Sequence, residues 1–499
     1  MKKYFSWTIV LSFVSLFSSH AEDLVEADSS SFSWYADSLT GGSPLYNFVR
    51  ASNLESAQLG ILVKEVASGR VLADYHSKSD LIPASVTKVI TTATALELFS
   101  DTFRFVTKLE CDGRLEDSVL YGNVYVTGGG DPTLGSSHNK QANTFFALAS
   151  TALRNSGVRR VAGRVVGDAS LFEETGTPAF WLIEDMGTNY SPTPSALSFN
   201  DNLLTMVVRT DSSSARLSAV YPANRLFKPQ LKLRIQGAKP SWRMTRTEYS
   251  YAPMLAGSLP ANGRYTIKTE IPDPALFVAD SLSSYLSNAG IPVDSASSVD
   301  REMYGRGARL KLLDYYSPML KDVILQTNYK SLNLYAENIF SYLSLSRDSI
   351  GSRRRSSEVV SSFWKEKGLA SDKIFQVDGS GLSMKNAINA SFLVDLLVYM
   401  KTQSRYSSTF VSSLPIAGVN GTVKSLLSGT PLSGKVYAKS GSMERVQNYC
   451  GYIHYKSRWY AFCIMVNNYS GDRYTVRQQI TRFLNSLMEE TNKPKSDKK

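Results

Sequence analysis

The order in which helical and strand-like patterns follow one another constrains the fold of this chain most strongly. Residues 59–75 predict two strands around a Ser-Gly turn, and a helix begins just after Pro83. Short β-like runs then dominate, and helical patterns return only from Met319 onward, before a strand hairpin and a last helix over 474–488. This order predicts one α+β unit whose first strands and helix are completed by the C-terminal half. Roughly residues 107–305 are inserted between the two halves.

The size of the chain agrees with several domains, because 499 residues are too many for one ordinary core. A hydrophobic content of 43% and a charged content of 20% are typical of a globular protein. The formal charge of +11 favours anionic polymers or membrane surfaces as partners. We expect no nucleic-acid partner, because no basic motif interleaved with aromatic residues occurs.

The N-terminus has the features of a secretory signal peptide. Met1-Lys2-Lys3 is a short basic region, Trp7 to Phe17 is an apolar stretch, and Ser19-His20-Ala21 offers a small-x-small cleavage site. We therefore expect an exported protein whose mature chain begins at Glu22, located in the periplasm or a comparable cell-envelope space. No later stretch reaches the roughly 18 uninterrupted apolar residues of a membrane span.

The C-terminal region supplies two further predictions. Tyr449 to Cys463 predicts a hairpin that turns at Lys456-Ser457, and this register places Cys450 opposite Cys463. Two buried reduced thiols are favoured over a disulfide, although both remain open. The last helix has one apolar face, which we expect to pack on its own sheet; peripheral association with a membrane or with the cell wall is the alternative.

The helix after Pro83 carries the first candidate for chemistry. Ser85 lies in its first turn and Lys88 three residues later, so both side chains share one helix face. A serine hydroxyl becomes a nucleophile when a base takes its proton, and a lysine with a lowered pKa can act as that base. A single Ser-x-x-Lys is a weak signal, because an exposed helix start explains it equally well.

Histidine or metal chemistry has little support in the sequence. The four histidines are His20, His76, His138 and His454, and they show no paired spacing. No HExxH or CxxC motif occurs either, so we expect no metal and no cofactor. The Gly-rich cluster at 128–132 lacks a phosphate-binding lysine, and we interpret it as a structural turn.

Two further short motifs suit an amine-activated serine. Ser331-Leu332-Asn333 offers a hydroxyl and an amide at the start of a predicted helix. The stretch Lys439-Ser440-Gly441-Ser442 ends a strand just before the hairpin. Its lysine supplies a positive charge, its hydroxyl can hydrogen-bond a carboxylate, and its glycine permits close backbone approach. Ser-x-x-Lys, Ser-x-Asn and Lys-Ser/Thr-Gly in this order form the signature of the penicillin-recognising serine acyltransferases.

The chain resembles the low-molecular-mass class C penicillin-binding proteins, the D-alanyl-D-alanine carboxypeptidase/endopeptidase family. Matching stretches include PASVTKVITTATALE, GGGDPTL, SPTPSALSFNDN, SPMLKDVILQTNYKSLNLYAENIF, VDGSGLS, LPIAGVNGTV and KSGS. Ser85 and Ser331 are 331 − 85 = 246 residues apart, whereas β-lactamases place these motifs much closer. The resemblance implies a β-lactamase/transpeptidase-like catalytic domain of the α+β (α/β-layered) class. Its antiparallel sheet is flanked by helices, and nested β-rich domains follow the nucleophile helix.

The resemblance also implies a division of the chain into named parts. We predict a signal peptide (1–21), a lead-in segment (22–45), the catalytic domain in two parts (46–106 and 306–490), the inserted β-rich domains (107–305) and a basic tail (491–499).

Roles for the motif residues follow from the same resemblance. Ser85 attacks the carbonyl of the penultimate D-Ala, with Lys88 as its base. Ser331, helped by Lys439, relays a proton toward the leaving D-Ala nitrogen, and Asn333 holds the substrate amide. The remaining substrate-binding residues are Ser440, which with Lys439 binds the terminal carboxylate, Gly441, and Ser442, whose backbone N–H joins that of Ser85 in an oxyanion hole.

Recognition of the substrate side chain is less defined. Asp168 in the stretch VVGDAS matches the family segment whose aspartate binds the amine end of diaminopimelate; a structural turn aspartate is the alternative. Met384 stands where family members often have an arginine that contacts the side-chain carboxylate. Recognition of a free diaminopimelate carboxylate therefore stays open.

The predicted function is an exported serine DD-peptidase. Its substrates are peptidoglycan stem peptides, with cleavage of D-Ala-D-Ala termini, of D-Ala-diaminopimelate cross-links, or of both. β-Lactam antibiotics are expected as covalent inhibitors. The alternatives are a penicillin- and wall-binding protein of poor activity and, with less support, a serine β-lactamase or esterase.

Overall fold

The computed structural model describes residues 41–139, 144–302 and 307–491. The predicted signal peptide, most of the lead-in segment and nearly all of the basic tail lie outside these residues. The described helices include none with the length and continuous apolarity needed to cross a bilayer.

A five-stranded antiparallel sheet joins the two ends of the described chain. Its order is β17-β18-β19-β1-β2, so the early strand β1 pairs with the late strand β19 from Gln58↔Asn467 to Glu65↔Tyr460. Both faces of the sheet are covered by helices, and apolar residues therefore occupy successive positions of β19 instead of alternate ones. The strands are β1 (Gln58–Glu65), β2 (Val71–Tyr75), β17 (Val436–Met443), β18 (Val446–Tyr455) and β19 (Arg458–Asn467).

The helix α11 (Arg473–Glu490) covers one face of this sheet together with α2 (Pro44–Val49). The rings of Phe48 and Phe483 stack with their centroids 5.0 Å apart, and the apolar face of α11 is buried. The predicted packing of the last helix on its own sheet is therefore confirmed.

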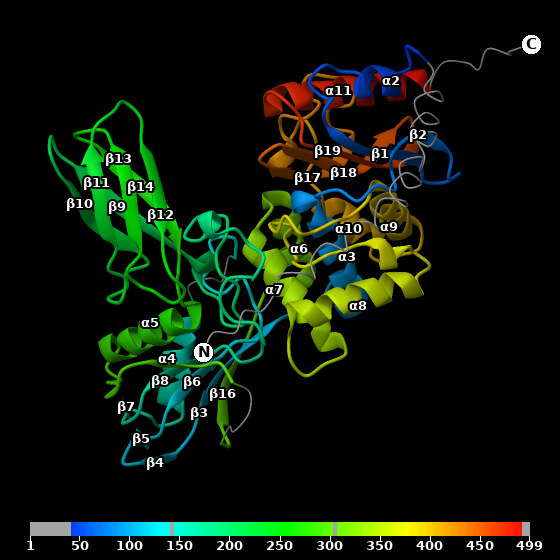
Figure 1. The fold of residues 1–499 in the computed structure, drawn as a ribbon. Coiled ribbons are helices and arrows are strands. Elements are labelled where there is room, and N and C mark those ends of the chain that lie inside the picture. Colours follow the sequence, from blue (N-terminus) through cyan, green and yellow to red (C-terminus); the bar gives the residue numbers. More distant parts are fainter. Residues whose placement is uncertain (1–40, 140–143, 303–306, 492–499) are drawn as a thin grey trace, which may run out of the picture.

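The opposite face of the sheet carries a layer of helices (Figure 1). At its centre lies α3 (Thr87–Phe99), whose first ten residues are all buried. Its buried threonine hydroxyls all have acceptors: Thr92 Oγ1 donates to Lys88 O within the helix at 2.7 Å, whereas Thr91 Oγ1 donates to Gly379 O at 2.8 Å. The surrounding helices are α6 (Leu320–Lys330), α7 (Asn333–Leu343), α8 (Arg353–Glu366), α9 (Ala390–Thr402) and α10 (Ser407–Ser413).

The chain leaves this α+β part and returns to it through two neighbouring strands. β3 (Val106–Cys111) pairs antiparallel with β16 (Leu310–Tyr316) in a second five-stranded sheet of order β15-β8-β6-β3-β16. The predicted boundary at residue 305 falls before β16. We therefore propose that the inserted part spans 106–316, and we call it the insert. The other strands of its main sheet are β6 (Val124–Thr127), β8 (Val165–Asp168) and β15 (Ser298–Asp300).

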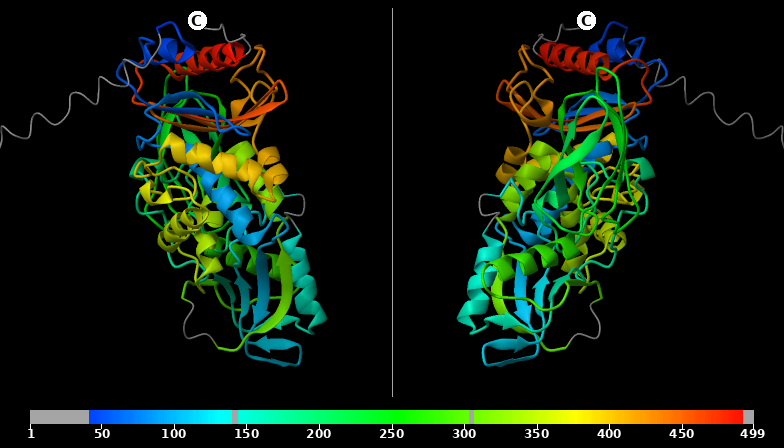
Figure 2. Two further views of the ribbon diagram at one scale, coloured as in Figure 1. Left: turned by 90° about the vertical axis from the view of Figure 1, so that its right-hand side faces the viewer. Right: turned by 90° about the vertical axis from the view of Figure 1, so that its left-hand side faces the viewer.

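The described residues of the insert also form three smaller sheets and two α-helices, and the insert lies on one side of the α+β part (Figures 1 and 2). The helices are α4 (Phe145–Asn155) and α5 (Pro274–Asn288). The small sheets have the orders β10-β9-β14, β11-β13-β12 and β4-β5-β7. Their strands are β4 (Arg114–Glu116), β5 (Val119–Tyr121), β7 (Arg160–Val161), β9 (Leu203–Thr210), β10 (Ala215–Tyr221), β11 (Gln230–Ile235), β12 (Ser241–Thr245), β13 (Met254–Leu259) and β14 (Arg264–Glu270).

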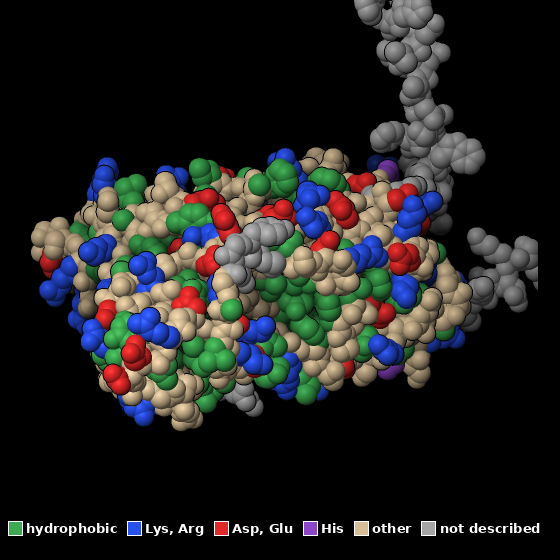
Figure 3. All heavy atoms as spheres, turned by 90° about the horizontal axis from the view of Figure 1, so that it is seen from below, with side chains coloured by type: hydrophobic (Ala, Val, Ile, Leu, Met, Phe, Trp, Pro, Cys, Tyr) green, Lys and Arg blue, Asp and Glu red, His purple; other side chains and the backbone are tan. Residues whose placement is uncertain are grey.

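The predicted hairpin register is confirmed, since Cys450 lies opposite Cys463 and Tyr455 opposite Arg458. Both cysteines are buried and free. On the face shown in Figure 3, basic and acidic side chains are interspersed. The expectation that nucleic acid is not a partner stays a prediction.

Candidate active site

The backbone before Ser85 is held in place by two asparagines of the central sheet. Asn448 Nδ2 in β18 donates to the carbonyls of Ile82 (2.9 Å) and Pro83 (2.8 Å). Asn467 Oδ1 in β19 accepts the N–H of Ile82 at 2.8 Å. The chain then enters a 3₁₀ turn (Ala84–Val86) that leads directly into α3. Ser85 is thereby placed at the N-terminal end of a buried helix.

Strand β17 runs past this turn at very short range. A Cβ atom added to Gly441 would lie 2.6 Å from Pro83 O and 3.1 Å from Ser85 N, so a side chain would force the strand away. Glycine at this position therefore lets the Lys439–Ser442 backbone lie beside the Ser85 turn.

Lys88 is buried and points its amine at Ser85. Its Nζ lies 2.9 Å from Ser85 Oγ, 2.6 Å from Asn333 Oδ1 and 2.7 Å from Ser380 O. Burial lowers the pKa of Lys88 to about 7, while the negative charges of Glu337 and Asp378 act in the opposite direction. Lys88 can therefore lose and regain a proton near neutral pH.

The three contacts of Lys88 suit the neutral amine. A neutral amine has two N–H donors and one lone pair, and Asn333 Oδ1 and Ser380 O can accept the two N–H groups. The lone pair then faces the Ser85 hydroxyl at 2.9 Å. This is the arrangement needed for proton removal from a serine nucleophile.

Ser331 and Asn333 lie where α6 ends and α7 begins. Ser331 ends α6 with a left-handed backbone (φ 60°), and its Oγ lies 2.9 Å from Lys439 Nζ. Asn333 is the first residue of α7 and meets Lys88 with its oxygen. Its Nδ2 donates to the backbone carbonyl of Tyr190 in the insert at 2.7 Å.

Lys439 is the second buried lysine of the cluster. Its Nζ also donates to Ser440 O at 2.7 Å. Burial, and then the positive charge of Lys88, hold the pKa of Lys439 well below its usual range. Ser440 Oγ lies 2.8 Å from Thr422 Oγ1, and the exposed Ser442 donates to Gln447 Oε1 at 3.0 Å.

A loop over 378–383 supplies the carbonyl that holds Lys88, and sequence reasoning assigned this loop no role. Asp378 accepts the N–H groups of Gly381 and Ser383 at 2.8 and 2.7 Å and so shapes the loop. Glu337 Oε1 accepts the N–H of Ser380 at 2.8 Å. Glu337 is fully buried, and its pKa is raised to about 7 by burial and by the Asp378 charge.

The insert also reaches the site, through two residues that the sequence analysis did not single out. Trp181 Nε1 donates to Asp378 Oδ2 at 3.0 Å, across 197 residues of sequence. Tyr190, whose carbonyl meets Asn333, donates its hydroxyl to Asp185 at 2.6 Å. The only available signal was the stretch SPTPSALSFNDN, which directly follows Tyr190.

Hydrogen bonds and close backbone approaches join seven of the nine predicted site residues: Ser85, Lys88, Ser331, Asn333, Lys439, Ser440 and Gly441. Ser442 directly follows Gly441 on β17. Asp168 is not brought to this group. It lies fully buried at the end of β8, where its Oδ2 pairs with Arg309 Nη1 at 2.6 Å and its Oδ1 accepts from Ser170. Its role in binding a substrate amine stays a prediction, and a structural turn aspartate stays the alternative.

In the described ranges, no group of three or more His, Cys, Asp and Glu side chains is arranged to hold a metal ion.

Comparisons with known proteins agree with this geometry. The sequence model of the D-Ala-D-Ala carboxypeptidase 3 (S13) family matches residues 45–487. The chain is 23% identical over 457 residues to a D-alanyl-D-alanine carboxypeptidase of Haemophilus influenzae, covering 87% of this chain and 91% of that protein. It is 28% identical over 435 residues to a D-alanyl-D-alanine carboxypeptidase of an Actinomadura species, covering 84% and 79%.

A solved structure shares the fold. The crystal structure of penicillin binding protein 4 from Haemophilus influenzae superimposes with a TM-score of 0.76 at 22% identity. The superposition covers 88% of this chain and 97% of that one. The same protein in complex with a β-lactam gives a TM-score of 0.73 at 21% identity. The predicted fold class is therefore confirmed.

Proposed function

Because the family match spans most of the chain, the protein belongs to the D-Ala-D-Ala carboxypeptidase 3 (S13) family, and we propose that it is a penicillin-binding serine DD-peptidase that acts through a Ser85 acyl-enzyme. The observation that carries this proposal is the environment of Lys88. A buried amine with a pKa of about 7 lies 2.9 Å from Ser85 Oγ, with two acceptors for its N–H groups.

Acylation begins with attack of Ser85 Oγ on the carbonyl carbon of the penultimate D-Ala. The serine proton passes to Lys88 Nζ, and the carbonyl oxygen becomes an oxyanion. The backbone N–H groups of Ser85 and Ser442 stabilise that oxyanion, helped by the position of Ser85 at a helix N-terminus. Losing one such donor typically costs about 3 kcal/mol of transition-state stabilisation.

Collapse of the tetrahedral intermediate expels the terminal D-Ala. Ser331 donates its proton to the leaving nitrogen and is supplied in turn by Lys439, which lies 2.9 Å away. The proton that Lys88 took from Ser85 passes to the Ser331–Lys439 pair, which leaves Lys88 neutral. Water then attacks the acyl-enzyme and gives up a proton to Lys88, which returns it to Ser85 Oγ as the ester bond breaks and the shortened peptide leaves. A β-lactam acylates the same serine through its ring carbonyl, which accounts for penicillin binding.

Binding of the substrate carboxylate falls to Lys439 and Ser440. An arriving anion favours protonation of Lys439, because it supplies the negative charge that this buried amine lacks. Asn333 holds the substrate amide from the end of α7. In the free protein its Nδ2 is engaged by Tyr190 O, so a substrate acceptor takes the place of that carbonyl.

The setting proposed for this reaction is the cell envelope, with peptidoglycan stem peptides as substrates. The basis for export is the N-terminal sequence pattern, and the periplasm is the expected compartment. Peripheral contact with the wall or membrane remains part of the same proposal.

One experiment tests the reaction and the residue together. The mature chain, Ser85→Ala and the surface control Ser412→Ala are incubated with a fluorescent penicillin and with a peptide that ends in D-Ala-D-Ala. We expect covalent labelling and D-Ala release from the mature chain and the control, and neither from Ser85→Ala. Labelling that survives Ser85→Ala contradicts the mechanism.

The products separate the alternatives within the family. Labelling without release of D-Ala from the peptide or cleavage of a cross-linked muropeptide identifies a binding protein, and rapid penicillin turnover identifies a β-lactamase. Cleavage of the cross-linked muropeptide beside the linear peptide measures the endopeptidase share of the activity.

A further inference from the structure

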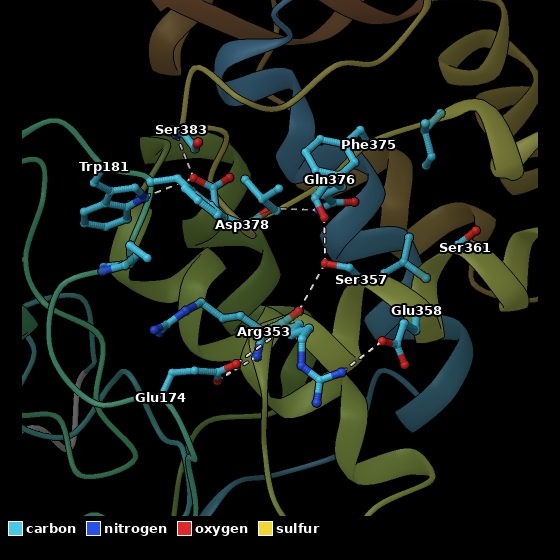
Figure 4. Close-up of a pocket in the computed structure, with 17 residues that line it drawn as sticks. Glu174, Trp181, Arg353, Ser357, Glu358, Ser361, Phe375, Gln376, Asp378 and Ser383 are labelled. Atoms are coloured by element: carbon cyan, nitrogen blue, oxygen red, sulfur yellow. Dashed lines mark hydrogen bonds and ion pairs between the residues drawn. The ribbon is translucent and has the colours of Figure 1, made fainter. Parts of the chain in front are cut away.

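A cavity of about 400 Å³ lies between the insert and α8, outside the catalytic cluster. Its walls are the insert segment 174–181, the first turns of α8 and the segment 374–378 (Figure 4). Ser85, Lys88, Ser331, Asn333 and Lys439 are not among its lining residues. The chemistry proposed above therefore leaves this cavity without a role.

Arg353 is the unusual side chain of this cavity. It is only 8% exposed, and no ion pair or hydrogen bond joins its guanidinium to another described residue. In Figure 4 it extends from α8 into the space between Glu174 and the Trp181–Asp378 pair. Guanidinium groups stay charged in proteins and offer five N–H donors, and the guanidinium nitrogens of Arg353 are not among the described side-chain atoms that are both buried and unpartnered, so these donors face the cavity.

The neighbouring charges are already matched by other groups. Arg354 pairs with Glu358 at 3.2 Å. Glu174 accepts from Ser352 Oγ at 2.7 Å and from the N–H groups of Arg353 and Arg354 at the start of α8. Asp378 accepts four donors, from Trp181, Gly381, Ser383 and Asn386. The charge of Arg353 acts on Glu174 and Glu337 without contact, and its guanidinium N–H groups have no hydrogen-bonded acceptor among the described residues.

The remaining walls are mostly apolar and include large exposed rings. Phe180 is 45% exposed and Phe375 is 58% exposed, although both line the cavity. Ligand sites commonly combine such apolar walls with a few placed polar groups. A group bound here can cover the two rings with an apolar body while it supplies acceptors to Arg353.

The chemistry of the acceptor follows from the charges. A guanidinium fork matches a carboxylate through two parallel hydrogen bonds. A doubly charged phosphate is disfavoured, because three carboxylates (Glu174, Glu358 and Asp378) line the cavity and Arg354 is already paired with Glu358, which leaves Arg353 as the cation free to contact an anion. A single negative charge on an apolar body fits the site best.

We propose that this cavity is a second binding site, for a small amphipathic monocarboxylate, with Arg353 as its anion anchor. The site is independent of Ser85 chemistry. It does share a wall with the catalytic machinery, because Trp181 and Asp378 line the cavity and also shape the loop whose Ser380 carbonyl holds Lys88.

The test uses 3-(4-fluorophenyl)propionate as a probe and its neutral amide as a matched compound, with binding to the full chain followed by ¹⁹F NMR. We expect saturable binding of the acid and at least about tenfold weaker binding of the amide, because a charge-assisted pair is lost. Arg353→Met weakens binding of the acid by about tenfold or more. Arg354→Met, which removes a neighbouring charge already paired with Glu358, changes it by less than about twofold.

Arg353→Lys serves as a second variant, since it keeps the charge and loses the planar fork. We expect binding between that of the natural chain and Arg353→Met, and thermal unfolding curves check that each variant folds. The proposal is overturned by no saturable binding, by equal binding of acid and amide, or by an unchanged affinity of Arg353→Met. It is also overturned if Arg354→Met weakens binding as much as Arg353→Met does. If Arg353→Met does not fold, the acid–amide comparison and Arg353→Lys decide.

Discussion

The surroundings of the two buried lysines, Lys88 and Lys439, differ in one respect. Each amine lies 2.9 Å from a serine hydroxyl, and each is completely buried. The charges of Glu337 and Asp378 act on Lys88, whereas the charge that acts on Lys439 is that of Lys88 itself. Burial lowers the pKa of both amines; the two carboxylates limit the shift of Lys88 to about 7, whereas the charge of Lys88 lowers the pKa of Lys439 further.

The different charges near the two amines suit them to different steps, proton transfer from Ser85 for Lys88 and binding of the substrate carboxylate for Lys439. Nearby carboxylates let Lys88 carry a proton through each turnover, since its two protonation states have similar free energies at neutral pH. No carboxylate charge acts on Lys439 in this way, so its pKa lies well below the usual range, and an anionic substrate stabilises its protonated form. The comparison predicts that the two lysines respond differently to mutation and to the charge of the substrate.

Replacing Lys88 has the largest expected effect. Lys88→Met removes the base that takes the Ser85 proton, and the rate of penicillin acylation falls by about a thousandfold. Stopped-flow or gel-based labelling over time measures this rate. Lys64→Met, which breaks a surface pair with Asp395, is the control and leaves it unchanged. A Lys88→Met protein that acylates within tenfold of the natural rate contradicts the assignment of Lys88 as the base.

Replacing Lys439 has a smaller effect that depends on the substrate. Lys439→Met lowers kcat/KM for a peptide ending in D-Ala-D-Ala by about a hundredfold, because a charge-assisted contact to the carboxylate is lost. The kcat/KM for the same peptide with a C-terminal amide falls much less, because the amide makes no charge-assisted contact with Lys439 in the natural chain. Equal losses for acid and amide substrates rule out carboxylate recognition by Lys439.

Glu337 tests the cause of the difference between the lysines. Glu337→Gln keeps an oxygen acceptor for Ser380 N–H but removes the charge that raises the pKa of Lys88. The acid limb of the acylation–pH profile therefore moves to lower pH, by about half to one unit. Glu358→Gln on the surface of α8 provides the matched control and leaves the limb in place. A shift to higher pH contradicts this account.

Trp181 has the smallest expected effect. Trp181→Phe removes one hydrogen bond to Asp378 and leaves most of the ring in place, so the loop that holds Lys88 is only loosened. Acylation slows by a few-fold, with a small drop in the thermal midpoint. Trp242→Phe, on the exposed strand β12, is the control. If Trp181→Phe lowers the acylation rate as much as Lys88→Met does, the role of Trp181 is larger than holding the 378–383 loop in place.

Local patterns predicted much of this protein. The hairpin register at Cys450 and Cys463, the buried face of α11 and the meeting of Ser85 with Lys88 all depend on spacing over a few residues, which periodicity and turn chemistry determine. The distant motifs could be ordered only through the family resemblance, because nothing in their spacing places Ser331 beside Lys439.

The contacts that the sequence did not indicate are long-range and side-chain specific. Trp181–Asp378 and Tyr190–Asn333 join segments 197 and 143 residues apart, and the buried Glu337 lies in an ordinary helix sequence. Asp168 has a partner that the sequence did not indicate either, because Arg309, 141 residues later, donates to its carboxylate. Burial and pairing of charges depend on packing, which a single sequence does not contain.

The pH dependence of Ser85 acylation shows directly whether Lys88, with its lowered pKa, is the base that takes the serine proton. Lys88 must be neutral to accept the serine proton, so the second-order rate constant for penicillin labelling rises with pH and levels off above the pKa of Lys88. We predict a midpoint near pH 7, set by the pKa of about 7. A rate that is still rising near the ordinary lysine pKa of about 10.4 contradicts the account, because Lys88 would then not be the depressed base.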